Sequence, residues 1–167
     1  MEKAPRSIKN GSLPFMVSRI SKLRVWPIWK ELKRLTVSAV CEDASASVRT
    51  EEYCRGLASD LGRNCELDKE IWLFNFLDMP GLRTVAADEA ALAHLVIISV
   101  HHAEILPEGV KGWIELWLKK RKDRNAVLLV LFDPVYRGIS SSTVGYLREV
   151  AERGHVEFLV RLDDSPN

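Results

Sequence analysis

No apolar stretch of this 167-residue chain approaches the roughly 20 residues that are needed to cross a bilayer. The N-terminus also lacks the unbroken apolar segment of a signal peptide. The chain has only three cysteines, Cys41, Cys54 and Cys65, and none of them belongs to a C-x-x-C pair or to a Cys/His metal spacing. An odd number of cysteines in such a pattern is typical of reduced thiols rather than of a disulfide framework. We therefore expect a cytoplasmic protein without a membrane span, in which the cysteines are buried thiols.

The common catalytic signatures are absent as well. The chain has no G-x-S-x-G nucleophile motif, no G-x-x-x-x-G-K-[ST] phosphate loop and no G-x-G-x-x-G dinucleotide motif. Cys41 and Arg49 do not have the spacing of a cysteine-phosphatase loop. Ser45, Ser47 and Thr50 echo a loop that binds the phosphate of FMN, but no glycine accompanies them, so they are interpreted as helix caps. We predict no catalytic residue and no bound cofactor.

Charge is distributed unevenly along the chain. Residues 1–34 contain nine Lys or Arg against two Glu, whereas the remainder contains fifteen against twenty-one acidic residues. We expect residues 1–16 to form a disordered basic tail and residues 17–34 to form a basic amphipathic helix, with either Met1 or Met16 as the natural start. A basic arm can bind nucleic acid, an anionic membrane surface or the acidic body of its own chain, and the sequence leaves these alternatives open.

The composition, with 47% hydrophobic and 28% charged residues, is that of an ordinary globular protein, and the length suits one core. Five short runs of strand-forming residues alternate with four helical patterns. Residues 95–100 and 126–132 are apolar on both faces, which is typical of strands covered by helices on both sides. The other strands are expected at residues 36–41, 71–77 and 156–160. Helices are expected after Ser47, from Pro80, from Pro107 and after the serine cluster at 140–142.

The alternation of strands with single helices predicts right-handed crossovers and a parallel sheet with helices on both faces. We therefore predict a single three-layer α/β domain over residues 35–167, with a five-stranded sheet in the flavodoxin- and receiver-like order 2-1-3-4-5. Such folds usually end in a fifth helix, but only residues 162–167 follow the last strand. The segment at 17–34 is expected to replace that helix, with Trp29 and Leu32 buried on the bare face of the sheet.

Three stretches resemble a known family. The segments VSAVCEDASASVRTEEYC, LVIISVHHAEILPEGVKGWIELWL and VLLVLFD are similar to sequences of uncharacterised bacterial proteins with a receiver-like or flavodoxin-like architecture. The resemblance spans residues 36–133. It implies the fold of a response-regulator receiver domain and assigns no activity.

The receiver resemblance can be tested at the strand ends. Phosphoryl transfer in a receiver needs an acidic pair after the first strand, an acceptor Asp ending the third, Ser or Thr ending the fourth and Lys ending the fifth. Glu42 and Asp43 supply the acidic pair. The third strand, however, runs into His101, the fourth ends at Asp133 and the fifth ends at Arg161. Phosphorylation by the receiver mechanism is therefore not expected.

Polar side chains follow the carboxyl ends of several predicted strands, which is where ligands bind in open parallel sheets. These residues are Glu42, Asp43, Ser99, His101, His102, Glu104 and Asp133. Because strands one, three and four are neighbours in the predicted order, we expect the acidic pair to converge with His101 and Asp133. Convergence would favour a bound divalent cation, a carboxylate with a raised pKa, or a polar ligand held by hydrogen bonds.

The densest basic run, residues 119–124, is interpreted as the charged end of a helix, where it compensates the helix dipole. Trp113 and Trp117 are four residues apart on that helix, so at least one of them is expected in the core rather than on a base-stacking surface. Nucleic-acid binding is disfavoured for these reasons. Weak contact of the N-terminal segment with a membrane surface is left open.

Two functions fit these observations. The first is a non-catalytic regulatory or protein-interaction module, receiver-like in fold, that takes part in signal transduction by binding a protein partner or a small effector. The alternative is a small enzyme, or a ligand- or metal-binding protein, that uses the acidic and His-lined crevice at the carboxyl edge of the sheet.

Overall fold

The computed structural model describes residues 22–101, 105–121, 125–133 and 141–162, without the side chains of residues 141 and 162. The predictions for the tail at 1–16, for the start of the helix at 17–21, and for His102 and Glu104 lie outside these residues. In the described part, no helix is both long and apolar enough to cross a membrane.

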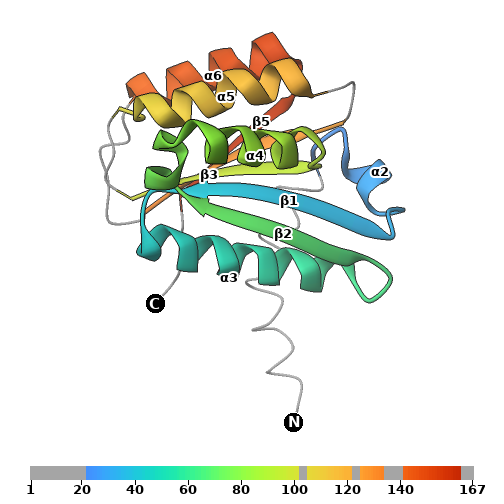
Figure 1. Ribbon diagram of the computed structural model, residues 1–167. Coiled ribbons are helices and arrows are strands. Elements are labelled where there is room, and N and C mark those ends of the chain that lie inside the picture. The colour runs from blue at the N-terminus through green and yellow to red at the C-terminus, as the bar shows by residue number, and fades with distance from the viewer. Residues whose placement is uncertain (1–21, 102–104, 122–124, 134–140, 163–167) are drawn as a thin grey trace.

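Five parallel strands form one sheet in the order β2-β1-β3-β4-β5, which confirms the predicted flavodoxin-like arrangement (Figure 1). The strands are β1 (Arg34–Cys41), β2 (Glu66–Leu73), β3 (Leu95–Val100), β4 (Val127–Phe132) and β5 (Glu157–Leu162). Every residue of β3 and β4 is buried, as their uninterrupted apolar runs predict for the central strands of a three-layer domain.

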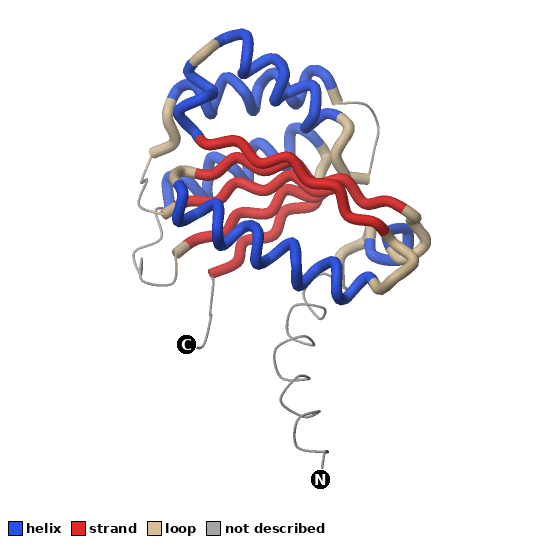
Figure 2. The backbone as a smooth tube through the Cα atoms, turned by 60° about the horizontal axis from the view of Figure 1, so that its bottom comes forward, coloured by secondary structure: helices blue, strands red, loops and turns tan. Residues whose placement is uncertain are grey.

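Helices cover both faces of the sheet (Figures 1 and 2). The helical elements are α2 (Trp26–Trp29), α3 (Ala44–Leu61), η1 (Phe74–Asp78), α4 (Pro80–Ala91), α5 (Glu108–Lys120) and α6 (Ser141–Gly154). Alternate residues of each central strand point to opposite faces, so Val96 and Ile98 pack in one core with α4, α5 and α6. Leu95 and Ile97 pack in a second core with α2 and α3. We call these the α5-side core and the α3-side core.

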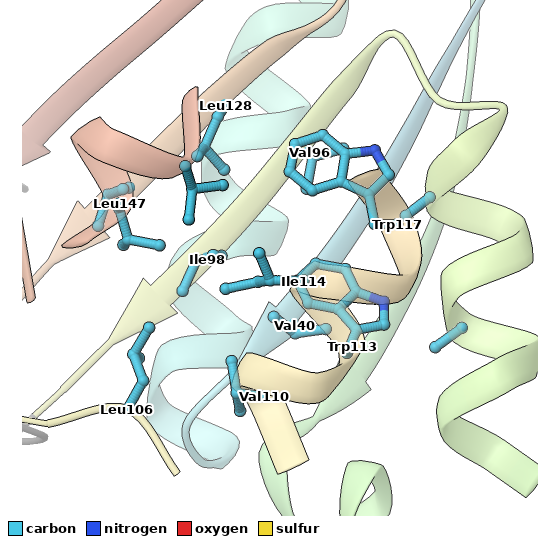
Figure 3. Packing of buried hydrophobic residues seen from close by; sticks show 14 of the residues in the cluster. Val40, Val96, Ile98, Leu106, Val110, Trp113, Ile114, Trp117, Leu128 and Leu147 are labelled. Atoms are coloured by element: carbon cyan, nitrogen blue, oxygen red, sulfur yellow. The ribbon is translucent and has the colours of Figure 1, made fainter. Parts of the chain in front are cut away.

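The α5-side core is dominated by one face of α5. Val110, Trp113, Ile114 and Trp117 all point from α5 towards the sheet, where Figure 3 shows them beside Val40, Val96 and Ile98. The rings of Trp113 and Trp117 stack with centroids 6.2 Å apart, and both side chains are fully buried. Both tryptophans are therefore core residues, and neither offers a surface for stacking nucleic-acid bases.

The second strand differs from its prediction at residues 71–77. Pairing with β1 begins at Glu66 and ends at Leu73, and the chain then forms the 3₁₀ helix η1. Residues three apart lie on the same side of a 3₁₀ helix, so Phe74 and Leu77 are both buried while Phe76 stays exposed. The apolar run at 71–77 is long enough for a strand. The strand begins before this run, however, because the charged residues there pair with β1 at the edge of the sheet, where their side chains can reach water.

The N-terminal segment forms a much shorter helix than predicted. Among residues 22–34 only Trp26–Trp29 is helical, because Leu35 enters β1 instead of continuing the helical pattern. Trp29 is fully buried in the α3-side core, as expected, whereas Leu32 is only partly buried. Two backbone N–H groups, of Arg24 and Val25, donate to the Glu157 carboxylate at 2.8 and 3.0 Å and tie the segment to the start of β5.

The start of α5 lies very close to η1. A Cβ atom on Gly109 would lie 2.6 Å from Asp78 Oδ1 and 2.9 Å from the carbonyl oxygen of Leu77. Glycine therefore permits a helix-to-backbone approach that any side chain would block. This contact holds η1, and with it the exposed Phe76, in a defined position beside the sheet.

Asp60 lies near the C-terminal end of α3, and burial destabilises the charged form of its carboxyl group. Its Oδ2 atom is buried and has no hydrogen-bond partner in the described structure. Burial raises the pKa of this carboxyl from 3.8 to about 6. The folded state therefore takes up a proton at a higher pH than the unfolded state, and the stability falls as the pH rises from about 4 to about 6.

Replacing Asp60 with Asn should raise the melting temperature at pH 7.5 and change it much less at pH 4, because only the charged carboxylate is penalised by burial. Thermal unfolding followed by circular dichroism at both pH values measures the difference. Glu52→Gln, which changes an exposed carboxylate of the same helix, is the matched control and should show no such pH-dependent gain. Equal melting temperatures for Asp60→Asn and the parent chain at pH 7.5 would contradict the prediction.

Candidate functional site

Three strand ends meet at the carboxyl edge of the sheet. The register pairs Cys41 of β1 with Ser99 of β3, and Val100 of β3 with Phe132 of β4. The next residues on these three strands are therefore neighbours. The N–H of Glu42 donates to the carbonyl of Ser99 at 3.0 Å, and the N–H of Asp133 donates to the carbonyl of Val100 at 3.3 Å. The fold thus brings the end of β1 and the end of β4 to either side of β3, as the strand order predicts.

Asp133 lies at the centre of a buried polar cluster. Its Oδ2 atom is 2.6 Å from Nδ1 of His101 and 3.4 Å from Nη2 of Arg49. The side chains of Asp133 and Arg49 are only 8% and 12% exposed, and that of His101 is 22% exposed. Because water is largely excluded from these side chains, the positive charge of the Arg49 guanidinium strongly stabilises the negative charge of the Asp133 carboxylate. We call Arg49, His101 and Asp133 the Asp133 cluster.

Glu42 connects two of the loops at this edge. Its Oε1 atom accepts a hydrogen bond of 2.6 Å from the backbone N–H of His101. A bond from an N–H group to a charged carboxylate is stronger than a neutral one, so it holds the segment after β3 against the segment after β1. The carboxylate of Glu42 therefore helps to position the imidazole of His101 through its backbone.

Asp43 and Ser99 hold the first turn of α3. The Oδ1 atom of Asp43 accepts from the N–H of Ala46 at 3.0 Å, which makes Asp43 the N-cap of α3. Ser99 is fully buried, and its hydroxyl donates to the carbonyl of Ala46 at 3.2 Å. Both predicted site residues thus act on the same turn, one as a helix cap and the other as a bond between α3 and β3.

The predicted convergence is therefore present for Glu42, His101 and Asp133, with Asp43 beside them as a cap. Among the described residues, no three or more His, Cys, Asp or Glu side chains are grouped so that they could hold a metal ion. Each carboxylate has its own partner: Asp133 contacts the Arg49 guanidinium and the His101 imidazole, whereas Glu42 and Asp43 accept hydrogen bonds from backbone N–H groups. Arg49, which supplies the guanidinium, was not among the predicted site residues.

Arg49 could have been found from its place in α3. A helix that follows β1 packs back over the sheet, so the residues of its first two turns that point inward lie near the carboxyl ends of the neighbouring strands. Arg49 is six residues beyond the N-cap and reaches the end of β4. The sequence shows its position in the helix, but its partner on β4 depends on the strand order.

Cys41 ends β1 directly before this site and is not a nucleophile. The side chain is fully buried, and burial raises the pKa of the thiol to about 11. Its Sγ atom contacts Oγ1 of Thr50 at 3.3 Å, and the Thr50 hydroxyl donates to the carbonyl of Ala46 at 3.0 Å. The thiol therefore stays protonated at neutral pH, which supports the interpretation of Cys41 as a core residue. Cys54 is also a buried free thiol, whereas Cys65 is only partly buried.

Arg161, near the end of β5, packs against α3. Its guanidinium carbon lies 5.5 Å from the centre of the Tyr53 ring, in a cation–π contact. Tyr53 is itself only 5% exposed. Arg161 therefore covers part of the α3-side core at the outer strand of the sheet.

Two hollows in the described part of the structure lie outside the Asp133 cluster. One, of about 460 Å³, lies at the opposite edge of the sheet, between the N-terminal segment and the turn from α6 to β5. Its polar lining includes Arg24, Glu152, His155 and Glu157. The other, of about 340 Å³, lies beside β2 and is lined mainly by apolar side chains.

The arrangement at the carboxyl edge is a set of charged and polar groups that bond to one another and to the ends of the strands. Comparisons of the chain with protein-family models, with curated proteins and with solved structures found no match.

Proposed function

We propose that this protein is a non-catalytic regulatory or protein-interaction module, receiver-like in fold and without phosphoacceptor chemistry. It acts in bacterial signal transduction in the cytoplasm, and its sequence resembles an uncharacterised bacterial family with a receiver-like architecture. The observation that supports this proposal is the state of the Asp133 cluster, in which the carboxylate is engaged by Arg49 and His101. A carboxylate so engaged holds the ends of the strands together and is poorly placed to accept a phosphoryl group or to coordinate a cation.

One observation favours the alternative, a small enzyme or a ligand- or metal-binding protein. The imidazole of His101 is oriented by a carboxylate at 2.6 Å and is 22% exposed, which is the arrangement of a general base. In that case Asp133 would orient His101, and Glu42 would fix the backbone of the same residue. The two functions differ in whether a ligand binds at this edge.

A thermal-shift titration separates the two proposals. Titration with Mg²⁺, Mn²⁺ or Zn²⁺, or with inorganic phosphate, should leave the melting temperature unchanged if the site is structural. A ligand of the folded state stabilises it by about 2.7 kcal/mol at a concentration about 100 times its Kd, which such a titration detects easily. Stabilisation that is present in the parent chain and lost in His101→Ala would contradict the interaction module and support the alternative.

A further inference from the structure

The outer edge of β2 carries an apolar hollow next to exposed apolar side chains. The hollow has a volume of about 340 Å³ and is lined by Glu70, Ile71, Trp72, Leu73, Phe76 and Leu82. We call it the β2 groove. Phe76 is 42% exposed, and Met79, at the start of α4, is 54% exposed.

The β2 groove lies across the edge of the sheet rather than on one face. Ile71 and Leu73 pack against the α3-side core, whereas Trp72 packs against the α5-side core. Successive side chains of a strand point to opposite faces, so a hollow lined by all three lies at the rim of the strand. It is therefore open to a chain that approaches β2 in the plane of the sheet.

The walls of the groove are held in place before anything binds. The indole N–H of Trp72 donates to the Glu89 carboxylate of α4 at 2.8 Å. The Phe76 ring meets the Trp72 ring edge-on, with centroids 6.5 Å apart. The 3₁₀ helix that carries Phe76 is in turn fixed by its close approach to Gly109. Such preorganisation lowers the entropic cost of binding.

The outer side of β2 is available for strand addition. In the described sheet β2 is the terminal strand, and its pairing with β1 runs from Glu66 to Leu73. An edge strand leaves every second N–H and C=O group facing outward, and proteins usually protect such edges with charge. Four of the first five residues of β2 are charged, namely Glu66, Asp68, Lys69 and Glu70, but the last three are Ile71, Trp72 and Leu73. Only half of this edge is therefore protected.

The charges beside the groove favour a basic partner. Arg34 lies 3.0 Å from Glu66 and 3.2 Å from Asp68, so those two carboxylates already have a cation. Lys69 lies 3.3 Å from Glu51. Glu70 lines the groove itself, is exposed and forms no ion pair with the described residues. A Lys or Arg side chain of a bound segment would meet a negative charge at this point.

A second copy of the chain fits this edge poorly. Two β2 strands related by a twofold axis pair antiparallel, and side chains that face each other must lie on the same face of the sheet. The two registers that pair nearly the whole strand place Lys69 against its own copy, or Glu70 against its own copy. Like charges directly opposite one another are destabilising.

We propose that the β2 edge binds an extended segment of a partner protein, which adds to the sheet as a sixth strand. A large apolar side chain of the segment fills the β2 groove, and a neighbouring Lys or Arg faces Glu70. Backbone hydrogen bonds to β2 supply affinity, and the groove and Glu70 supply specificity. The proposal rests on the function proposed above and names the surface and the partner class of that interaction module.

The test uses the full chain and a phage-displayed library of random peptides of the length of β2. Selected peptides should alternate in polarity and combine a large apolar residue with Lys or Arg. A synthetic copy of one selected peptide, labelled with fluorescein, should bind saturably in an anisotropy titration. Phe76→Asp should weaken binding at least about tenfold, as expected for a central apolar contact, and Glu70→Lys should weaken it as well. Val48→Asp, at an α3 residue that is 58% exposed, is the matched control and should leave the affinity unchanged.

Methylation of alternate backbone nitrogens in the peptide should abolish binding, because strand addition needs those N–H groups. The proposal is overturned if no selected peptide distinguishes the parent chain from a folded Phe76→Asp variant, or if the methylated peptide binds as well as the unmodified one. Sedimentation that finds a dimer of the parent chain and a monomer of Phe76→Asp would assign the edge to a second copy and overturn it too.

Failure here is distinguishable from failure of the proposed function. Peptides whose binding is lost in Leu92→Asp or Ile105→Asp but unchanged in Phe76→Asp would leave the interaction module in place and move its surface elsewhere. A metal ion or phosphate that binds at His101 would instead contradict the interaction module, whatever the peptides do.

Discussion

Replacing Trp29 with Ala is expected to lower the free energy of unfolding by about 3–5 kcal/mol, the usual cost of removing a fully buried aromatic side chain. Trp29 has no exposed surface and packs with Val25 and Leu35 in the α3-side core. Truncation would leave a cavity that the four-residue helix α2 can collapse into only partly. For a chain of this size the loss corresponds to a fall of roughly 10 °C in the melting temperature.

The neighbouring residue provides the control for this prediction. Ile28 lies in the same short helix but is 47% exposed, so Ile28→Ala should change stability by at most about 0.5 kcal/mol. Urea unfolding followed by circular dichroism measures both variants. Equal stability of Trp29→Ala and Ile28→Ala would mean that the N-terminal segment does not contribute to the folded core in solution.

The second large effect is expected from Asp133→Ala. Removing this carboxylate leaves the Arg49 guanidinium, which is 12% exposed, without its buried counter-charge. Breaking a buried ion pair by removing one partner typically costs about 3–5 kcal/mol, far more than the pair itself contributes. We therefore expect a clear loss of stability, with the melting temperature measured by differential scanning calorimetry.

Asp88→Ala is the matched control for Asp133→Ala. The Asp88 carboxylate lies 2.9 Å from Nζ of Lys120, but its side chain is 59% exposed. Exposed ion pairs contribute about 0–1 kcal/mol, so this variant should be nearly neutral. If Asp133→Ala were as stable as Asp88→Ala, the Asp133 cluster would not hold the strand ends together, and the ligand-binding alternative would gain support.

Trp29 and Asp133 lie in different parts of the same domain. Trp29 and its neighbours fill the α3-side core near the start of β5, whereas the Asp133 cluster holds the opposite ends of the central strands. The polar groups at the carboxyl edge contact one another and the ends of the strands, and so hold the fold together. The β2 edge, by contrast, presents an apolar groove together with an outer strand, which is why the interaction proposed for this protein is placed there.

Much of the fold was predictable from local pattern. Residues 95–100 are a strand with the predicted limits, because six consecutive apolar or small residues are compatible with burial on both faces. Pro80 also marked the start of α4 correctly. The start of α3 was predicted too late, because Asp43 is its N-cap and the expected caps Ser45, Ser47 and Thr50 lie inside the helix. The strand order follows from parallel strands with right-handed crossovers and was predicted on the same grounds.

The errors arose where distant contacts overrule local preference. The apolar run at 71–77 contains a strand end and a 3₁₀ helix, because Phe74 and Leu77 bury together in that geometry. The segment at 17–34 has helical spacing, but Leu35 is required in β1, so the described helix ends at Trp29. In both segments the spacing of the apolar residues is compatible with more than one type of secondary structure.

The candidate site shows the same division. The sequence by itself determined that acidic residues follow β1, that His101 follows β3 and that Asp133 follows β4, and it determined through the strand order that they share one edge of the sheet. Only the tertiary structure decided that Arg49 reaches Asp133 from α3 and that Glu42 binds the backbone of His101. The physical reason is that a strand end specifies where a side chain starts, whereas its charge partner depends on how the helix packs over the sheet.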